Sequence, residues 1–179
     1  MKADRKAITK GLSTLLEKHL SANDNFWAKE VSIETLDRCR PDYVSVSAHF
    51  GKFASLSSIE RAVVSVYEVK SCLADYKSGH GLNAVGDVNY IVAPYELIMK
   101  LTEMQCDGEI EQIDKLGLWG TAYPFPESHG RVPDVANLPV YEGQVDDWRL
   151  YWIEPTYRLG RNQPISTFLW SMMYAGVNR

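Results

Sequence analysis

The chain has 179 residues, of which 45% are hydrophobic and 23% charged, and its formal net charge is −4. These values are ordinary for a globular protein and exclude a largely disordered chain. The negative charge argues against a protein that coats nucleic acid through an overall positive field, and only a local basic groove stays open. A chain of this size buries roughly 70% of its unfolded surface, so we interpret residues 1–179 as a single domain.

The length of the apolar runs and the number and spacing of the cysteines indicate the cellular compartment in which the protein is expected. No apolar run approaches the roughly 18 to 20 residues that span a bilayer, and the N-terminus lacks the apolar centre of a signal peptide. The cysteines, Cys39, Cys72 and Cys106, are odd in number and widely spaced, which fits reduced thiols. We therefore expect a cytoplasmic protein with no membrane contact. The absence of a Cys-x-x-Cys motif argues against structural zinc.

The first part of the chain predicts a helix followed by three strands. Residues 3–20 carry an apolar stripe at helical spacing, formed by Ile8, Leu12, Leu15, Leu16 and Leu20. Alternating apolar and polar residues then predict strands over 26–35 and 41–50, and in the first of these Trp27, Lys29, Val31 and Ile33 share one face. A loop over 51–58 leads to a β-branched third strand over 62–70.

The middle of the chain predicts further helices and strands. A short helix over 71–76 is broken by the stretch KSGHG, and a fourth strand follows over 87–94. Pro94 opens a helix that runs to Gln105, because proline is tolerated at the first helical position. Residues 116–123 predict a fifth strand, which Gly117 and Gly120 weaken.

The last part of the chain contains the least regular segment. Residues 124–147 are rich in Pro, Gly and Asp and show little periodicity, which indicates an irregular insertion. A strand over 148–157 and a closing helix over 164–175 complete the chain. Together the elements predict an α/β fold with a mixed, mainly antiparallel central sheet flanked by helices.

Three charged residues stand out at the ends of neighbouring predicted strands. Glu68 and Lys70 project from the same side of the third strand, which Val64 and Val66 continue inward. Asp42, just after Pro41 at the start of the second strand, offers a second carboxylate. Desolvating such groups is costly, so they form either a structural ion pair at the sheet end or a chemical site. Two carboxylates can hold Mg²⁺, and a lysine can serve an attacking water in phosphodiester hydrolysis.

The pattern of Pro41 and Asp42 followed by Glu68, Val69 and Lys70 resembles the signature of the PD-(D/E)XK nuclease superfamily. The segment YEVKSCLADYKSGHGLNAVGDVNYIVAP is similar to the MmcB-like branch of DNA-repair and phage nucleases. The resemblance covers residues 26–105. It implies a restriction-endonuclease-like core (αβββαβ).

The resemblance also implies an activity and a set of roles. Asp42 and Glu68 would bind Mg²⁺ or Mn²⁺, Lys70 would be the catalytic lysine, and Ser71 and Asp75 would lie just behind them. The implied protein is a metal-dependent DNA endonuclease of bacterial or phage origin, acting in DNA repair, recombination or phage DNA processing. Its partner would be DNA, and a homodimer is compatible with the sequence.

Several alternatives stay open from the sequence. The KSGHG stretch stands where MmcB-like sequences carry an acid, a lysine and a tryptophan, and the third acid of the superfamily would be either Glu17 or Glu30. A catalytically inactive relative that binds nucleic acid or a protein partner is the second interpretation, and an acidic loop over 142–147 that masks the site is the third. A set of basic residues forms either a phosphate-contacting rim or a solvated surface: Arg38, Arg40, Lys77, His80, Arg158 and Arg161.

Overall fold

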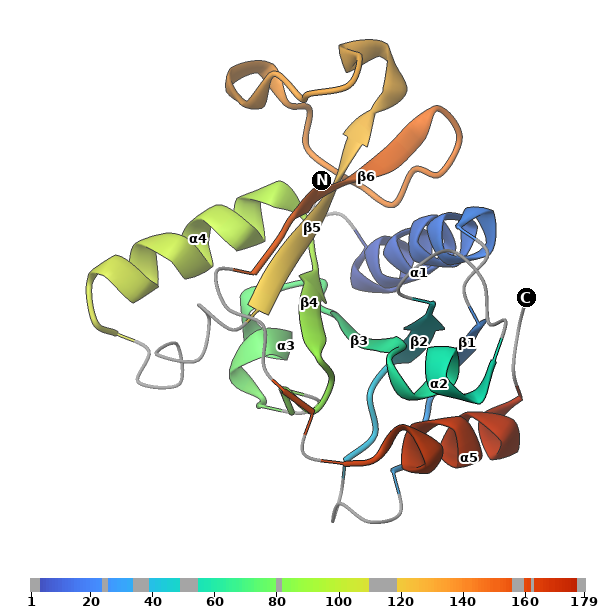
Figure 1. Cartoon of the computed structure of the whole chain (residues 1–179). Coiled ribbons are helices and arrows are strands. Elements are labelled where there is room, and N and C mark those ends of the chain that lie inside the picture. Colours follow the sequence, from blue (N-terminus) through green and yellow to red (C-terminus); the bar gives the residue numbers. More distant parts are fainter. Residues whose placement is uncertain are drawn as a thin grey trace.

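A six-stranded sheet, with its strands side by side in chain order, forms the centre of the protein (Figure 1). The computed structural model describes residues 4–23, 26–33, 39–48, 55–79, 82–109, 119–155, 160–161 and 163–176. The strands are β1 (Phe26–Lys29), β2 (Tyr43–Ser47), β3 (Val63–Val69), β4 (Val88–Val92), β5 (Trp119–Pro126) and β6 (Trp148–Ile153). The helices are α1 (Arg5–Ala22), α2 (Leu56–Glu60), α3 (Leu73–Lys77), α4 (Tyr95–Cys106) and α5 (Ile165–Ala175).

The sheet is mixed and mainly antiparallel, as the sequence predicts. Strands β1, β2 and β3 form an antiparallel meander, and β6 pairs antiparallel with β5. The pairings of β3 with β4 and of β4 with β5 are parallel. Each parallel step is spanned by a segment that contains a helix, α3 or α4, as parallel neighbours require a crossover. The chain is therefore an α/β protein.

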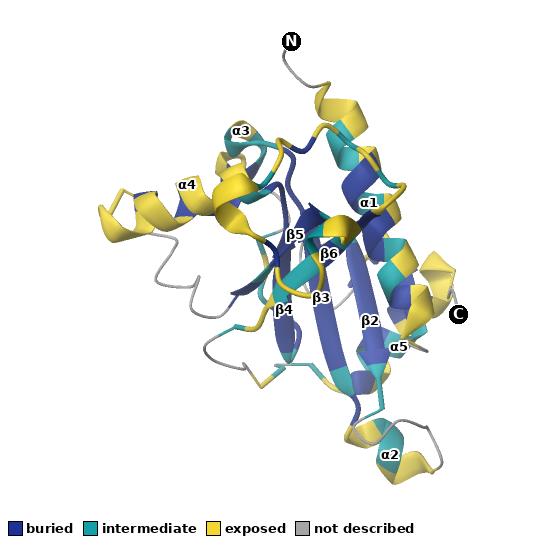
Figure 2. Ribbon diagram, turned by 90° about the horizontal axis from the view of Figure 1, so that it is seen from above, coloured by how far each residue is buried: buried dark blue, intermediate teal, exposed yellow. Residues whose placement is uncertain are grey.

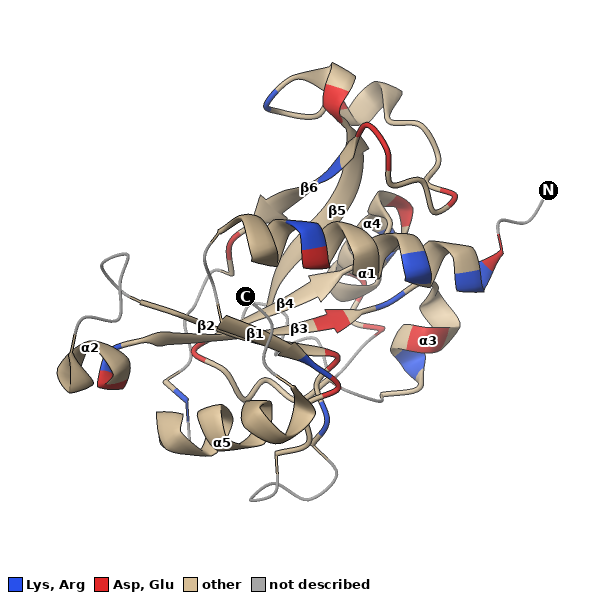
Figure 3. Cartoon of the chain, turned by 90° about the vertical axis from the view of Figure 1, so that its right-hand side faces the viewer, with Lys and Arg blue, Asp and Glu red and all other residues tan. Residues whose placement is uncertain are grey.

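Helices cover both faces of the sheet (Figure 3). On one face, four buried leucines of α1 pack against aromatic and aliphatic side chains of the strands, including Trp27, Tyr67 and Tyr90. On the other face, α5 packs on the valines of β2 and β3, and α4 packs on Ile91 and Tyr123. The middle strands are almost entirely buried (Figure 2) because they are covered on both sides. Among the described residues, no helix combines the length and apolar character needed to cross a membrane.

Helix α1 is fixed at its start and along its side. Asp4 caps the helix, its carboxylate accepting a hydrogen bond from the backbone N–H of Lys6 at 3.1 Å. Gly11 lets the segment around Tyr141 and Gly143 approach closely, since a Cβ at position 11 would collide with the Tyr141 hydroxyl and with the Gly143 carbonyl. The segment 124–147, predicted to be irregular, thus packs on α1.

The predicted first strand is shorter than expected. Strand β1 ends at Lys29 because Glu30 takes a left-handed backbone conformation with φ 56°. The backbone N–H groups of Glu30 and Val31 both donate to the partner segment, to Asp42 and Pro41, whereas successive N–H groups of a regular strand point to opposite edges. The alternation is therefore interrupted. Val31 packs with Ala28 rather than with Trp27, and the prediction that Trp27 and Val31 share a face is wrong.

Two further boundaries differ from prediction. The expected loop before β3 contains α2, which starts at a capping box formed by Ser55 and Ser58. Strand β5 continues to Pro126, into the predicted insertion. Its pairing with β4 ends at Ala122, so the two prolines that follow remove no hydrogen bond to β4. The predicted residues 34–35, 49–54, 116–118 and 156–157 lie outside the described residues.

Candidate active site

Asp42 and Glu68 lie next to each other where β2 begins and β3 ends. The register pairs Tyr43 with Tyr67, so the residues one step further out, Asp42 and Glu68, are neighbours across the two strands. The Asp42 carboxylate accepts a hydrogen bond from the Val69 backbone N–H at 2.8 Å. This bond fixes Asp42 against the carboxyl end of β3, beside the parallel strand β4, where ligands commonly bind in α/β sheets.

Lys70 lies beside Glu68, deep in the protein. Glu68 is 1% exposed and Lys70 is 4% exposed. The Lys70 ammonium nitrogen, Nζ, is 3.5 Å from Glu68 Oε2, and the Lys70 backbone N–H donates to Val92 of β4 at 2.9 Å. Val64 and Val66, on the same side of the strand, are fully buried. The structure thus brings Asp42, Glu68 and Lys70 together.

Burial and the neighbouring Asp42 carboxylate both destabilise the charged form of Glu68. Burial, and then the charge of Asp42, raises the pKa of Glu68 from 4.5 to about 9, and Lys70 opposes this only in part. Burial also raises the pKa of Asp42, although the Val69 N–H and Lys70 favour its charged form. Without a cation, the pair therefore retains a proton at neutral pH. Among the described residues, Glu68 Oε1 has no hydrogen-bond partner.

These groups form the floor of a polar cavity of about 410 Å³. One wall belongs to α1, which contributes Arg5, Thr9 and Ser13 at a spacing of one helical turn. The remaining lining comes from Lys29, Glu30, Arg40, Tyr43, Val69 and Asp75. The segment 124–147 is described throughout and none of its residues lines the cavity, so the acidic loop 142–147 does not mask the site.

Behind Lys70, a small network links α1 to the end of β3. Arg5 Nη2 is 3.1 Å from Asp75 Oδ1, and Arg5 Nε donates to the Ser71 hydroxyl at 3.3 Å. The Ser71 backbone N–H and hydroxyl both donate to Asp75 Oδ2 at 3.3 Å. Ser71, the residue next to Lys70, is therefore held by Asp75 and Arg5, and the family resemblance singled out both Ser71 and Asp75. Arg5 is not among the predicted site residues, although Arg5, Thr9 and Ser13 form a polar stripe at helical spacing that could have indicated it.

The two candidates for the third acidic residue, Glu17 and Glu30, lie at different positions relative to the cavity. Glu17 accepts a hydrogen bond from the Tyr43 hydroxyl at 2.8 Å and lies 3.5 Å from Lys29 Nζ, and it does not line the cavity. Glu30 lines the cavity but pairs with Arg40. Within the described part of the chain, no three His, Cys, Asp or Glu side chains are grouped to hold a metal ion. Neither glutamate completes a three-acid site.

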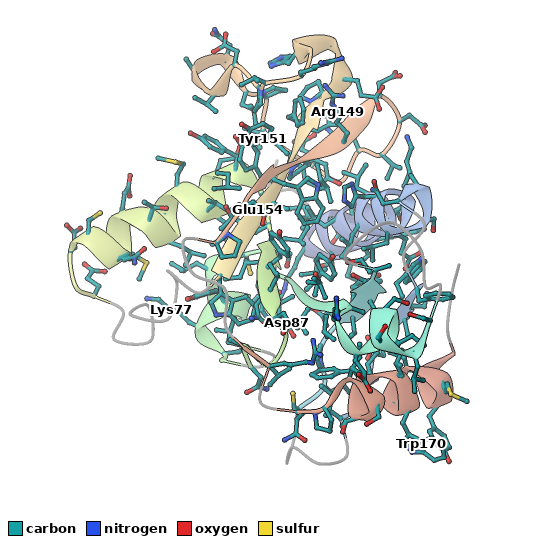
Figure 4. All side chains as sticks on the ribbon, viewed as in Figure 1. Lys77, Asp87, Arg149, Tyr151, Glu154 and Trp170 are labelled. Carbon is teal, nitrogen blue, oxygen red and sulfur yellow. The ribbon has the colours of Figure 1, made fainter. Side chains whose placement is uncertain are left out.

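The predicted basic rim is only partly at the site. Arg40 lines the cavity, whereas Lys77 does not. Arg161 lies at the opposite end of β3, where it pairs with Asp87 at 2.5 Å and donates to the carbonyls of Ala62 and Glu60, so of the two alternatives left open for it the rim around this cavity does not apply. Lys77 and Asp87 are labelled in Figure 4. Arg38, His80 and Arg158 lie outside the described residues.

A second cavity, of about 480 Å³, lies between α4 and strands β5 and β6. It is lined mostly by apolar and aromatic side chains, among them Tyr95, Trp119 and Tyr123. Glu154 is the one charged residue in that lining, as far as the chain is described. With one carboxylate and no cationic side chain in its described lining, this cavity offers fewer groups for acid–base or cation chemistry than the first, so the first cavity is the candidate site.

The floor of the first cavity fits a hard divalent cation. Asp42 and Glu68 offer carboxylate oxygens, which Mg²⁺ and Mn²⁺ prefer, and Glu68 Oε1 is buried without a partner. A cation would replace the proton that the pair retains and would remove the repulsion between the carboxylates. Comparisons of the chain with protein-family models, with curated proteins and with solved structures gave no match.

Proposed function

We propose that the protein is a metal-dependent DNA endonuclease of the PD-(D/E)XK type, with Asp42 and Glu68 holding Mg²⁺ or Mn²⁺ and Lys70 as the catalytic lysine. The observation that carries the proposal is the buried carboxyl group of Glu68, whose pKa is raised, between the half-buried carboxyl of Asp42 and the buried side chain of Lys70, all three lining an open polar cavity. Buried groups of this kind, whose pKa is strongly perturbed, cluster at functional sites.

The chemistry follows from the placement of the side chains. When bound, the cation supplies Lewis acidity toward a phosphoryl oxygen. Asp42 and Glu68 hold it, and the hydrogen bond from Val69 to Asp42 fixes the direction of that carboxylate. Lys70 donates hydrogen bonds from Nζ to the attacking water or to the phosphoryl oxygens as negative charge develops on them. Arg5, Ser71 and Asp75 hold the backbone next to Lys70 and so position its side chain.

The order of the elements supports the same proposal. The run α1, β1, β2, β3, α3, β4 follows the αβββαβ order of the restriction-endonuclease-like core, with α2 as a short addition between β2 and β3. The carboxylates and the lysine lie at adjoining ends of β2 and β3, where the signature residues of the superfamily belong.

The test is cleavage of single-stranded, duplex and branched DNA with Mg²⁺ or Mn²⁺. We expect the native protein to cut at least one of these substrates, chelator to stop the reaction, and Asp42→Ala and Lys70→Ala to abolish it. The matched control is Glu96→Ala, which removes an exposed acid of α4 and should cut at the native rate. Urea unfolding of each variant verifies that it is folded. Cutting by Asp42→Ala at the native rate, or no cutting of any substrate, would overturn the proposal.

A second candidate function is a catalytically inactive protein of the same fold that binds nucleic acid or a protein partner. It is favoured by the absence of a three-acid metal cluster among the described residues. The cleavage test separates the two, because an inactive protein would cut no DNA at any cation concentration, whether its partner is a nucleic acid or a protein.

A further inference from the structure

Two of the three groups on the cavity floor, Glu68 and Lys70, are deeply buried, and Asp42 is half-buried. Glu68 and Lys70 are 1% and 4% exposed, and the cavity above them has a volume of about 410 Å³. This volume lies in the range of small-molecule pockets, about 300 to 1,000 Å³. A phosphodiester must therefore enter the cavity to reach the two side chains, and the nucleotide that carries it must enter at least in part.

A nucleotide in a duplex is poorly suited to such entry. Taking a paired base out of its stack costs a few kcal/mol, and the cost is smallest where the strand is already unpaired. The depth of the floor thus favours a flexible single strand over a rigid duplex.

The wall made by α1 suits the backbone of such a strand. Lys6 and Lys10 precede the cavity-lining residues Thr9 and Ser13 by three positions each, so they are surface neighbours of that polar stripe. Lys6 and Lys10 are exposed. Arg5 is 59% exposed, and its described contacts to Ser71 and Asp75 use two of the five N–H donors of a guanidinium.

The charge of α1 contrasts with that of the whole chain. Between Arg5 and Ala22 the helix carries four basic residues, Arg5, Lys6, Lys10 and Lys18, and one acidic residue, Glu17. The chain as a whole has a net charge of −4. Figure 3 shows the basic segments of the N-terminal half of α1 above the end of β3 and above α3. A positive strip at the cavity mouth would attract a phosphate backbone.

We propose that the cavity takes a nucleotide of an unpaired DNA strand, and that Arg5, Lys6 and Lys10 of α1 hold the phosphates of that strand. This inference rests on the proposed function for the nature of the ligand. It adds that single strands, flaps and frayed ends are the preferred substrates, and that α1 is the helix that binds them. Thr9 and Ser13 offer hydroxyl donors along the same wall.

The test measures binding without cleavage. Fluorescence anisotropy in chelator compares a labelled single strand with a blunt duplex of the same sequence, for the native protein and for the double variant Lys6→Ala/Lys10→Ala. The matched control, Lys18→Ala/Lys100→Ala, removes the same charge from exposed positions that do not line the cavity. Both variants change exposed side chains, so both should fold, which circular dichroism verifies.

We expect the single strand to bind more tightly than the duplex. The Lys6→Ala/Lys10→Ala variant should bind the single strand at least about fivefold more weakly at low salt, and the slope of log K against log salt concentration should fall by about 1.4, or about 0.7 per phosphate contact. Tighter binding of the duplex, no binding of either DNA, or equal weakening in the control would overturn the inference.

The outcome is distinguishable from that of the proposed function. A protein that prefers the single strand through α1 but cuts no DNA with Mg²⁺ or Mn²⁺ contradicts only the endonuclease assignment. A protein that cuts duplex DNA in an Asp42-dependent way but shows no preference for unpaired strands contradicts only the inference about α1.

Discussion

The carboxyl group of Glu68 should make the stability of the cation-free protein fall as the pH rises. Its pKa is about 9 in the folded protein and 4.5 ordinarily, so between these values the folded chain holds a proton that the unfolded chain has released. The free energy of unfolding is therefore highest below pH 4.5, falls by up to about 1.4 kcal/mol per pH unit above it, and stops falling near pH 9. Glu68→Gln cannot titrate and should lack this dependence.

The assay is urea unfolding in chelator at pH 6, 7 and 8. Between pH 6 and pH 8, the native protein should lose about 3 kcal/mol relative to Glu68→Gln, which is two pH units at the limiting slope. Glu96→Gln, an exposed glutamate of α4, is the matched control and should follow the native protein. At pH 8, Mn²⁺ at a hundredfold excess over its Kd should return about 2.7 kcal/mol to the native protein and little to Glu68→Gln. Parallel pH dependence in the native protein and Glu68→Gln would show that Glu68 does not retain an extra proton in the folded protein.

Three further substitutions test how the site is supported. Gly11→Ala should lower the free energy of unfolding by about 1–3 kcal/mol, because the new Cβ meets Tyr141 and Gly143, and an unchanged melting temperature would contradict that packing. Asp87→Ala should cost about 2 kcal/mol in urea unfolding, because the Val64 N–H and Arg161 lose their acceptor, while cleavage below the melting temperature stays native since Asp87 is at the far end of β3. Glu17→Gln should cut DNA at the native rate and lose at most about 1 kcal/mol, and a loss of cleavage would show that Glu17 serves the cation after all.

The sequence predicts most of the sheet and the grouping of the site because both follow from periodicity. The alternation in β3 places Val64, Val66, Glu68 and Lys70 on one face, and the antiparallel pairing of β2 with β3 brings Asp42 beside Glu68. Periodicity alone does not predict where the backbone departs from regular strand geometry. The left-handed conformation of Glu30 ends β1 early, and nothing in the residue type announces it.

Contacts between segments that are distant in the chain could not be predicted from the sequence either. The pairing of Arg161 with Asp87 joins residues far apart in the chain, so the sequence left Arg161 open between a basic rim and a solvated surface and did not show the ion pair. Arg5 reaches Ser71 and Asp75 only because α1 packs over the sheet, as its buried leucines require. Nor does the apolar pattern show which apolar residues stay exposed. Helix α5 is predicted from its apolar residues, yet the side chain of Trp170 on this helix is 51% exposed (Figure 4).

The most direct test of the central claim is a crystal structure of the protein with Mn²⁺ at pH 8, measured at a wavelength where manganese scatters anomalously. The account predicts one anomalous peak on the cavity floor, within about 2.0 to 2.3 Å of a carboxylate oxygen of Asp42 and of Glu68, and no such peak in Glu68→Gln crystals treated in the same way. A cavity floor without manganese at saturating concentration, with Glu68 and Lys70 still in contact, would contradict it and would leave these residues as a structural pair.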